Sequence, residues 1–181
     1  MKILITGGQG DIALAIKKAI EAKYPDWLVY NPSKSELDVA NEDSVERYFS
    51  SKEIDILINN AGVIYPDVVK SSDIGSWLKT INVNLIGTYL TTRFALEKGC
   101  QKIISIASTS GLKGRAGWSS YCASKAGVIS FTESLVEEGI DAHCLVARRT
   151  DTKMRNQLFP NEDKSSLDTP ESVANQIIEL L

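Results

Sequence analysis

The chain has 181 residues, of which 43% are hydrophobic and 24% are charged, and its formal net charge is −3. These values are typical of a globular protein with a hydrophobic core, and we expect residues 1–181 to form a single domain. The charge disfavours nucleic acid or an anionic membrane as a partner, and no apolar run approaches the ~18 residues that a membrane span requires.

Short apolar runs alternate with longer helical patterns along the chain. Six runs are predicted to be strands: 2–6, 27–30, 36–39, 54–59, 102–108 and 141–147. Five patterns are predicted to be helices: 11–23, about 42–52, about 73–98, 119–138 and 170–181. Because the strands are apolar and alternate with helices, the pattern predicts an α/β fold with one doubly wound parallel sheet of about six strands, covered by helices on both faces.

Several expected element boundaries carry their own chemical signals. Gly99 and Gly139 follow the third and fourth helical patterns, and glycine commonly ends a helix. Thr169 and Pro170 are expected to be the N-cap and the first residue of the last helix. The polar stretch 155–168 is expected to be a loop and is a candidate for a mobile flap.

The segment "TGGQGDIA" (6–13) lies between the first predicted strand and the first predicted helix. Gly7 and Gly10 permit a tight turn with close backbone approach, and Ala13 is small enough for the helix to pack closely on the strand. A helix N-terminus supplies amide groups and a positive dipole end, which suit a pyrophosphate. The segment therefore predicts a nucleotide-binding turn, and the alternative is a turn that only connects strand and helix.

Five motifs in this order resemble those of the short-chain dehydrogenase/reductase family, and the resemblance covers nearly the whole chain. They are the glycine turn, "LDV" (37–39), "NNAG" (59–62), "NVN" (82–84), and Ser108 placed thirteen residues before Tyr121. The resemblance implies a compact Rossmann-type oxidoreductase that transfers a hydride between NAD(P)(H) and a small carbonyl or alcohol substrate. It also implies these cofactor-binding residues: Gly7, Gly10, Asp11, Ile12, Asp38, Val39, Asn60, Ala61, Gly62, Tyr121, Lys125 and Thr152.

A tyrosine four residues before a lysine is a candidate proton-transfer pair, and the chain contains this spacing three times. The pairs are Tyr30/Lys34, Tyr48/Lys52 and Tyr121/Lys125. Ligands of doubly wound sheets bind at the carboxyl ends of the strands. Only the third pair is predicted to lie at that edge with both side chains on one helical face, because Tyr121 lies in the first turn of its helix. Ser108 ends a predicted strand at the same edge.

The chemistry of this pair suits proton transfer. Free tyrosine has a pKa of about 10, and a neighbouring ammonium group should lower it, so we expect Lys125 to lower the pKa of Tyr121. The family resemblance assigns Tyr121 as the acid/base, Ser108 as the hydrogen-bonding partner of the substrate oxygen, Lys125 as a further ligand of the nicotinamide ribose, and Asn84 as support for a proton relay. The alternative is that these four are ordinary residues of the fold.

The second predicted strand is followed by "NPSK", where members of the family that use NAD commonly carry an acidic residue. Ser33 and Lys34 could hold a 2′-phosphate through hydroxyl and ammonium donors. NADP(H) is therefore the preferred cofactor, with NAD(H) as the alternative. A solvated lysine in a turn is the other interpretation of Lys34.

The sequence departs from the family pattern in three places. The segment between the second and third predicted strands leaves no room for the usual helix, and the family's last strand has no counterpart, so we expect a small substrate-binding region. Ala147 and Arg148 stand at the positions of the usual Pro-Gly pair. One of Arg148 and Arg149, with Arg115, could grip a phosphate or carboxylate of an anionic substrate or of the cofactor. Solvent-facing arginines are the alternative.

Other residues bear on partners and location. Tyr65 and Trp118 are expected at the same edge, where they either line a pocket or only pack. His143 is expected to be a packed strand residue, so no metal site is predicted. The three cysteines form no CxxC pair, which favours a reduced, cytoplasmic protein.

The resemblance also implies a homodimer or homotetramer that assembles through the helices at about 73–98 and 119–138. The alternative to an enzyme is a sensor or regulatory module that binds a dinucleotide on the same fold without turning over a substrate. The missing Pro-Gly pair supports that alternative, and the presence of Asn84, Ser108, Tyr121 and Lys125 together argues against it.

Overall fold

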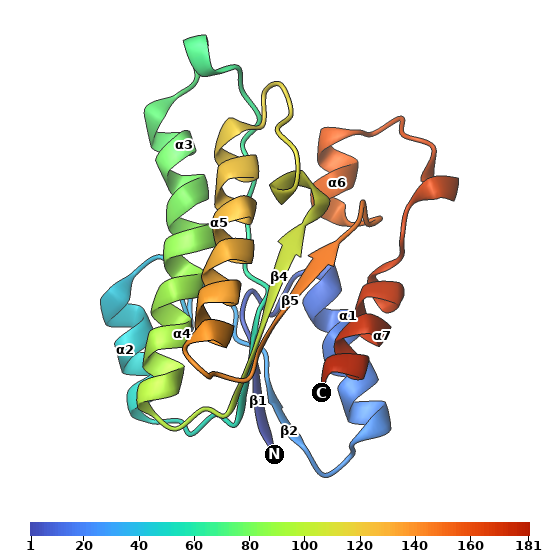
Figure 1. The fold of residues 1–181 in the computed structure, drawn as a ribbon. Helices are drawn as coiled ribbons and strands as arrows, with labels where there is room; N and C mark the ends of the chain where they lie inside the picture. Colours follow the sequence, from blue (N-terminus) through green and yellow to red (C-terminus); the bar gives the residue numbers. More distant parts are fainter.

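Five parallel strands form the central sheet of the computed structural model, which describes residues 1–181 (Figure 1). They are β1 (Lys2–Ile5), β2 (Leu28–Tyr30), β3 (Ile56–Asn59), β4 (Lys102–Ser108) and β5 (Ala142–Ala147). The strand order is β2-β1-β3-β4-β5, and every neighbouring pair is parallel. The predicted doubly wound α/β fold is therefore confirmed, with the reversal of strand order between β1 and β3.

The prediction of about six strands was wrong, because the run 36–39 is not a strand. Leu37 and Val39 are buried in the core, which explains their apolar character, but the chain between β2 and the next helix is built of turns. The Leu37 amide donates to the Ser33 carbonyl at 3.0 Å and closes one of these turns. No helix lies in this connection, as its short length predicted.

Helices cover both faces of the sheet (Figure 1). They are α1 (Asp11–Lys23), α2 (Glu42–Ser50), α3 (Ile74–Ile81), α4 (Gly87–Glu97), α5 (Ser119–Glu137), α6 (Lys153–Leu158) and α7 (Pro170–Leu180). Ile3 and Ile5 of β1 pack into the core beneath α1 and α7, whereas Leu4 points into the core beneath α2, α4 and α5. This alternation follows from the two-residue period of a strand whose two faces are both buried.

The predicted long helix at about 73–98 is present but interrupted. α3 and α4 are joined by one π-helical turn, Asn82–Ile86, in which the Gly87 amide donates to the Asn82 carbonyl five residues earlier. A π-turn inside a helix inserts an extra residue and often marks a functional position. This turn contains Asn84, whose side chain is completely buried.

Most helix ends agree with the sequence signals. Thr169 caps α7 by accepting the Ser172 amide at 3.1 Å, and Pro170 is the first residue of that helix. Gly99 and Gly139 follow α4 and α5 with positive φ angles, 85° and 81°, which glycine adopts without strain.

The predicted loop 155–168 was wrong in its first part, where α6 extends to Leu158. Thr152 nucleates this short helix, because its hydroxyl accepts the Arg155 amide at 3.2 Å. Ion pairs hold the rest of the segment against its neighbours. One of them joins Lys164 Nζ and Asp151 Oδ1, which lie 3.0 Å apart.

Two further observations concern the whole chain. Cys100, Cys122 and Cys144 are all free thiols. None of the helices combines the length and the apolar character that crossing a membrane would require. The cytoplasmic location stays a prediction.

Candidate active site

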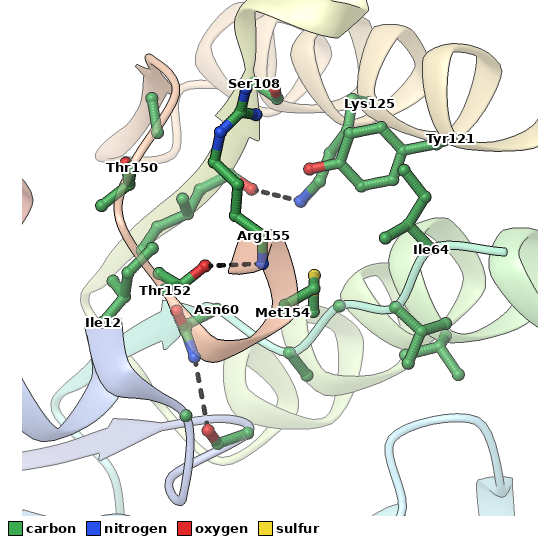
Figure 2. Close-up of a pocket in the computed structure, with 18 of the residues that line it drawn as sticks. Ile12, Asn60, Ile64, Ser108, Tyr121, Lys125, Thr150, Thr152, Met154 and Arg155 are labelled. Atoms are coloured by element: carbon green, nitrogen blue, oxygen red, sulfur yellow. Dashed lines mark hydrogen bonds between the residues drawn. The ribbon is translucent and has the colours of Figure 1, made fainter. Parts of the chain in front are cut away.

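A cavity of about 600 Å³ opens at the carboxyl edge of the sheet. All five strands contribute to its lining through residues at or just beyond their carboxyl ends: Gly7, Lys34, Asn60, Ser108 and Arg148. This is the edge at which doubly wound sheets bind ligands. Figure 2 shows how side chains from α5, α6 and the strand ends converge in this space.

The glycine turn after β1 is shaped for close backbone approach. Gly7 has a φ of 65°, and a Cβ at this position would lie 2.9 Å from the Cα of Ala61. Gly10 is the N-cap of α1 and offers no side-chain cap, so the first amides of α1 are left for a ligand. Asp11 and Ile12 of that first turn line the cavity, and the arrangement fits a dinucleotide pyrophosphate.

Asn60 connects the glycine turn with the end of β3. Its side-chain amide donates to the Thr6 carbonyl at 2.9 Å, and the backbone amides of Asn60 and Ala61 each donate to the Thr6 hydroxyl at 3.0 Å. Ala61 and Gly62 continue along the cavity wall. The "NNAG" segment thus holds the glycine turn in place and forms part of the cavity.

Ser108, Tyr121 and Lys125 line the same cavity, as their predicted places at the sheet edge require. Tyr121 lies in the first turn of α5, and the buried Lys125 donates its Nζ to the Ile106 carbonyl at 2.7 Å. Ser108 ends β4, and its Oγ accepts the Ser110 amide at 3.2 Å. Since that contact uses an acceptor site of the oxygen, the Ser108 hydroxyl proton is free to point at a ligand.

The other two Tyr/Lys pairs do not form a site in the cavity. The Lys52 ammonium lies over the rings of both Tyr48 and Tyr30, 4.9 and 5.6 Å from their centroids. Lys34 does line the cavity, but Tyr30 does not. Position in the fold, and not the spacing, therefore separates the three pairs.

The expected effect of Lys125 on Tyr121 was wrong for this structure. Burial raises the pKa of Tyr121, and Ser108 and the charge of Arg155 only oppose part of this rise. Burial also lowers the pKa of Lys125 to about 8. Both shifts have one physical reason, which is that removing a group from water disfavours its charged form. The phenol is thus held in its protonated form at neutral pH.

The Asn84 side chain does not line the cavity. Its Oδ1 accepts the Val63 amide at 2.8 Å, and its Nδ2 donates to the Val63 carbonyl and to the Ser124 hydroxyl, each at 3.0 Å. These bonds connect the π-turn, the "NNAG" segment and α5. Ser124, which lies within the helix predicted over residues 119–138, is part of that connection. A role for Asn84 in a proton relay stays a prediction.

The residues after β2 only partly match their predicted positions. Asp38, Val39 and Lys34 line the cavity, whereas Ser33 does not. The Ser33 hydroxyl and amide both donate to one carboxylate oxygen of Glu36 at 2.8 Å. Lys34 is largely exposed and lies 3.4 Å from Asp38, so its ammonium group already has one anionic neighbour.

The turn before α6 approaches the first turn of α1. The Lys153 amide donates to the Asp11 carboxylate at 2.6 Å, and Thr152, predicted to bind the cofactor, lies beside this contact and lines the cavity. The start of α6, just before the candidate flap, is therefore attached to α1 by a direct hydrogen bond. This places the start of α6 next to the expected pyrophosphate position.

Sequence reasoning missed Arg155, which lines the cavity from α6. Its only sequence signal was its place three residues after the capping Thr152. Tyr65 and Trp118 both line the cavity, and Trp118 packs edge-on against Tyr121 with ring centroids 5.7 Å apart. Arg115, Arg148 and Arg149 also border the cavity, and all three are exposed to solvent, so their proposed grip on an anion stays a prediction.

Comparison with known proteins agrees with the motifs. Residues 33–163 match the profile of the family described as short chain dehydrogenase. The 3-oxoacyl-(acyl-carrier-protein) reductase FabG of Aquifex aeolicus is 32% identical over 153 residues, which cover 80% of this chain and 60% of that protein. Acetoacetyl-CoA reductase of Acinetobacter is 36% identical over 97 residues, which cover 51% of this chain and 39% of that protein. The chain thus spans less than two thirds of the length of these relatives.

Solved structures show the same fold at lower identity. Aldohexose dehydrogenase of Thermoplasma acidophilum aligns with a TM-score of 0.82 over 99% of this chain and 86% of that chain, at 21% identity. Levodione reductase aligns with a TM-score of 0.82 over 99% of this chain and 89% of that chain, at 23% identity.

Proposed function

Since the chain belongs to the short-chain dehydrogenase family, we propose that it interconverts a small carbonyl compound and its alcohol, using NAD(P)(H). The observation that carries this proposal is that Ser108, Tyr121 and Lys125 line the same cavity as the glycine turn. A dinucleotide bound along this cavity would extend from that turn toward the three side chains.

The cofactor is proposed to lie along the carboxyl edge of the sheet. Gly7, Gly10 and Ile12 would hold the pyrophosphate at the start of α1, and Thr152 would contact it from the start of α6. Asp38 and Val39 would border the adenine, and Asn60 to Gly62 the neighbouring ribose. When bound, the nicotinamide supplies or accepts the hydride.

Tyr121 is proposed as the proton donor to the carbonyl oxygen. A phenol with an ordinary or raised pKa is protonated at neutral pH, so the Tyr121 proton is available when the oxygen becomes negative. The Ser108 hydroxyl would donate a hydrogen bond to the same oxygen, since its Oγ is already oriented by the Ser110 amide. The Lys125 ammonium would stabilise the phenolate left after proton transfer.

NADP(H) is the proposed cofactor over NAD(H), and the support is the ammonium group of Lys34 at the adenosine end of the cavity. That ammonium group also pairs with Asp38, and the Ser33 hydroxyl donates its hydrogen bond to Glu36. The proposed preference for NADP(H) therefore rests on Lys34 alone. The kcat/KM for NADPH should exceed that for NADH, and Lys34→Gln should reduce the ratio.

The activity is tested with purified protein, NADPH or NADH, and a panel of small aldehydes, ketones and keto-sugars. Tyr121→Phe removes only the acidic hydroxyl and should lower kcat by at least about a hundredfold, which is the usual contribution of a general acid. Binding of NADPH should change little. Tyr48→Phe is the matched control, because Tyr48 has the same spacing to a lysine but does not line the cavity.

Two results would count against the enzyme. Tight binding of NADPH without turnover of any carbonyl compound would favour the dinucleotide-binding sensor. Equal turnover by the wild type and Tyr121→Phe would remove Tyr121 from the mechanism.

A further inference from the structure

Four arginines gather at the substrate end of the cavity: Arg115, Arg148, Arg149 and Arg155, which we call the arginine cluster. Eight of the side chains that line the whole cavity are Lys or Arg, and only two are Asp, although the chain as a whole is acidic. The cavity is therefore a region of concentrated positive charge, and such a region attracts anionic ligands.

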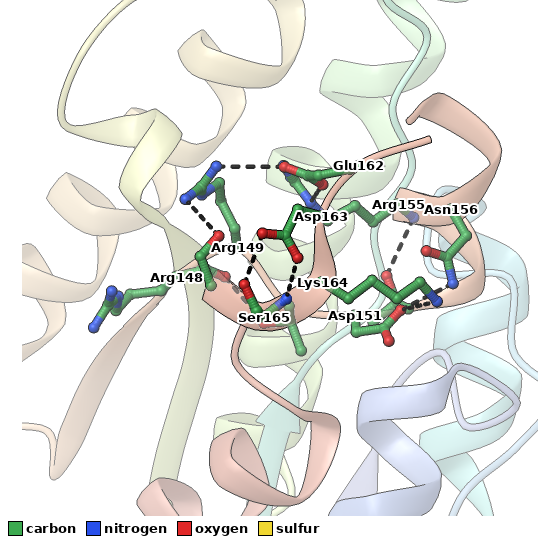
Figure 3. A network of polar contacts seen from close by, with 12 residues as sticks. Arg148, Arg149, Asp151, Arg155, Asn156, Glu162, Asp163, Lys164 and Ser165 are labelled. Carbon is green, nitrogen blue, oxygen red and sulfur yellow. Dashed lines mark hydrogen bonds and ion pairs between the residues drawn. The ribbon is translucent and has the colours of Figure 1, made fainter. Parts of the chain in front are cut away.

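Arg155 is the most enclosed member for which an exposure is measured, with 13% of its side chain exposed, against 46% for Arg149. Its Nε donates to Glu162 Oε2 at 2.5 Å, and its Nη2 donates to Glu162 Oε1 at 2.6 Å. Figure 3 shows this pair within the polar network of the segment that follows β5. A guanidinium group has five N–H donors, so this side-on contact leaves three of them free, including both on Nη1.

The free edge of the guanidinium group lies at the reaction site. Figure 2 shows the Arg155 side chain extending through the cavity from α6 toward Ser108 and the Tyr121 hydroxyl. The charge of Arg155 is close enough to Tyr121 to oppose the rise of its pKa. A ligand group bound to this free edge would thus lie next to the reacting carbonyl.

Glu162 does not balance the charge of the cluster. Its carboxylate also meets Arg149 Nη1 at 3.3 Å, and its pKa is lowered first by the hydrogen bonds from Arg155 and then by the charges of Arg155, Arg149 and Arg115. Arg155 and Arg149 therefore share the Glu162 carboxylate, while Arg148 extends away from this network in Figure 3. Arg155 is partly buried, and a partly buried positive charge that shares its counter-charge with a second arginine would be stabilised by an anionic ligand.

We propose that Arg155 binds an anionic group, carboxylate or phosphate, that the carbonyl substrate carries close to its reacting carbon. Glu162 is a positioning residue: it holds the Nε edge so that the Nη1 and Nη2 donors face the cavity as a two-pronged fork. The substrate class is thus a keto acid or a keto phosphate. This proposal rests on the proposed reductase activity of the same cavity.

The test compares substrates that differ in charge at one place. With NADPH, acetoacetate is paired with methyl acetoacetate, and dihydroxyacetone phosphate is paired with dihydroxyacetone. The anionic member of one pair should have a kcat/KM about ten to a hundred times higher, as expected for hydrogen bonds to a charged group. The pair that shows the larger ratio identifies the carboxylate or the phosphate as the preferred group.

Variants assign the preference to Arg155. Arg155→Gln combined with Glu162→Gln removes the charge pair without leaving a lone carboxylate, and it should bring the ratio of kcat/KM between the charged and the neutral member of the pair, both measured with the same variant, close to one. Arg155→Lys keeps the charge but loses the fork, so it should retain only part of the preference. Arg93→Gln, which removes an exposed arginine of α4 outside the cavity, is the control and should behave as wild type.

The outcomes separate this inference from the reductase activity itself. Equal kcat/KM for charged and neutral members would overturn the inference and leave the reductase in place. A double variant that raises the KM for NADPH and spares the charge preference would assign Arg155 to the cofactor, which also overturns it. No turnover of any carbonyl by the wild type would instead overturn the reductase proposal. Unchanged far-ultraviolet circular dichroism of each variant verifies folding.

Discussion

At the scale of single residues, Lys125 shows how burial controls the chemistry of this site. Its Nζ is enclosed by protein and makes one hydrogen bond, to the Ile106 carbonyl. A buried ammonium group with one neutral partner is less stable than the same group in water, which is why its pKa falls to about 8. The positive charge of Lys125, which would stabilise a phenolate at Tyr121, is therefore partly lost just above neutral pH.

This shift predicts a specific dependence of stability on pH. Between about pH 8 and 10.5 the unfolded chain keeps the Lys125 proton while the folded chain has lost it, so the free energy of unfolding should rise with pH. The rise due to this residue should be about 3 kcal/mol and should be absent in Lys125→Met. Urea unfolding of both proteins at pH 7.5 and pH 10, without cofactor, measures the difference. Parallel pH profiles would show that Lys125 titrates normally.

At the scale of elements, the spacing between β4 and α5 places Ser108 relative to Tyr121. The chain leaves β4 through one turn of 3-10 helix, Thr109–Gly111, which rests directly on α5. A Cβ on Gly111 would lie 2.7 Å from the carbonyl carbon of Lys125 and 2.8 Å from the Ala126 amide nitrogen. Because these neighbours are helix backbone, they cannot move aside as a flexible side chain could.

Gly111→Ala should therefore displace this turn and lower both activity and stability. We expect kcat/KM to fall at least about tenfold, because small errors in the position of catalytic groups cost much of the rate. The free energy of unfolding should fall by about 1–3 kcal/mol from overpacking. Gly114→Ala is the control in the same loop, since a Cβ there meets nothing within 4 Å. Equal effects of the two substitutions would show that the contact with α5 is unimportant.

At the scale of the whole molecule, apolar side chains remain exposed along one side of the fold. Leu78, Ile86 and Tyr89 of the α3–α4 column are exposed, as is Val136 of α5. Tyr89 packs edge-on against Phe131 of α5, with ring centroids 6.2 Å apart, so the exposed surface continues across both helices. We propose that this surface forms the homodimer or homotetramer contact that the family resemblance implies.

Light scattering after size exclusion tests the assembly. The wild type should have at least twice the mass of one chain, and Ile86→Glu combined with Tyr89→Asp should have the mass of one chain, since buried unpaired charges oppose association. Leu14→Glu is the control, because Leu14 is exposed on α1, on the other side of the sheet. A wild type with the mass of one chain at all concentrations would contradict the proposal.

The sequence alone determined the features that depend on local pattern and chain order. Alternating apolar runs predicted the parallel sheet, and glycines, Thr169 and Pro170 predicted helix ends, because these signals act within a few residues of one another. Chain order also placed Tyr121, Lys125 and Ser108 at one edge, because every strand of a parallel sheet ends there.

Only the tertiary structure decided the features that depend on burial or on distant partners. Leu37 and Val39 look like a strand but are buried within turns, and that distinction requires knowledge of what packs on them. Arg155 enters the cavity because Thr152 starts a helix and Glu162 holds the guanidinium group, and no local pattern contains both contacts. The pKa shifts of Tyr121 and Lys125 likewise come from the removal of water, which a sequence does not show and a folded environment does.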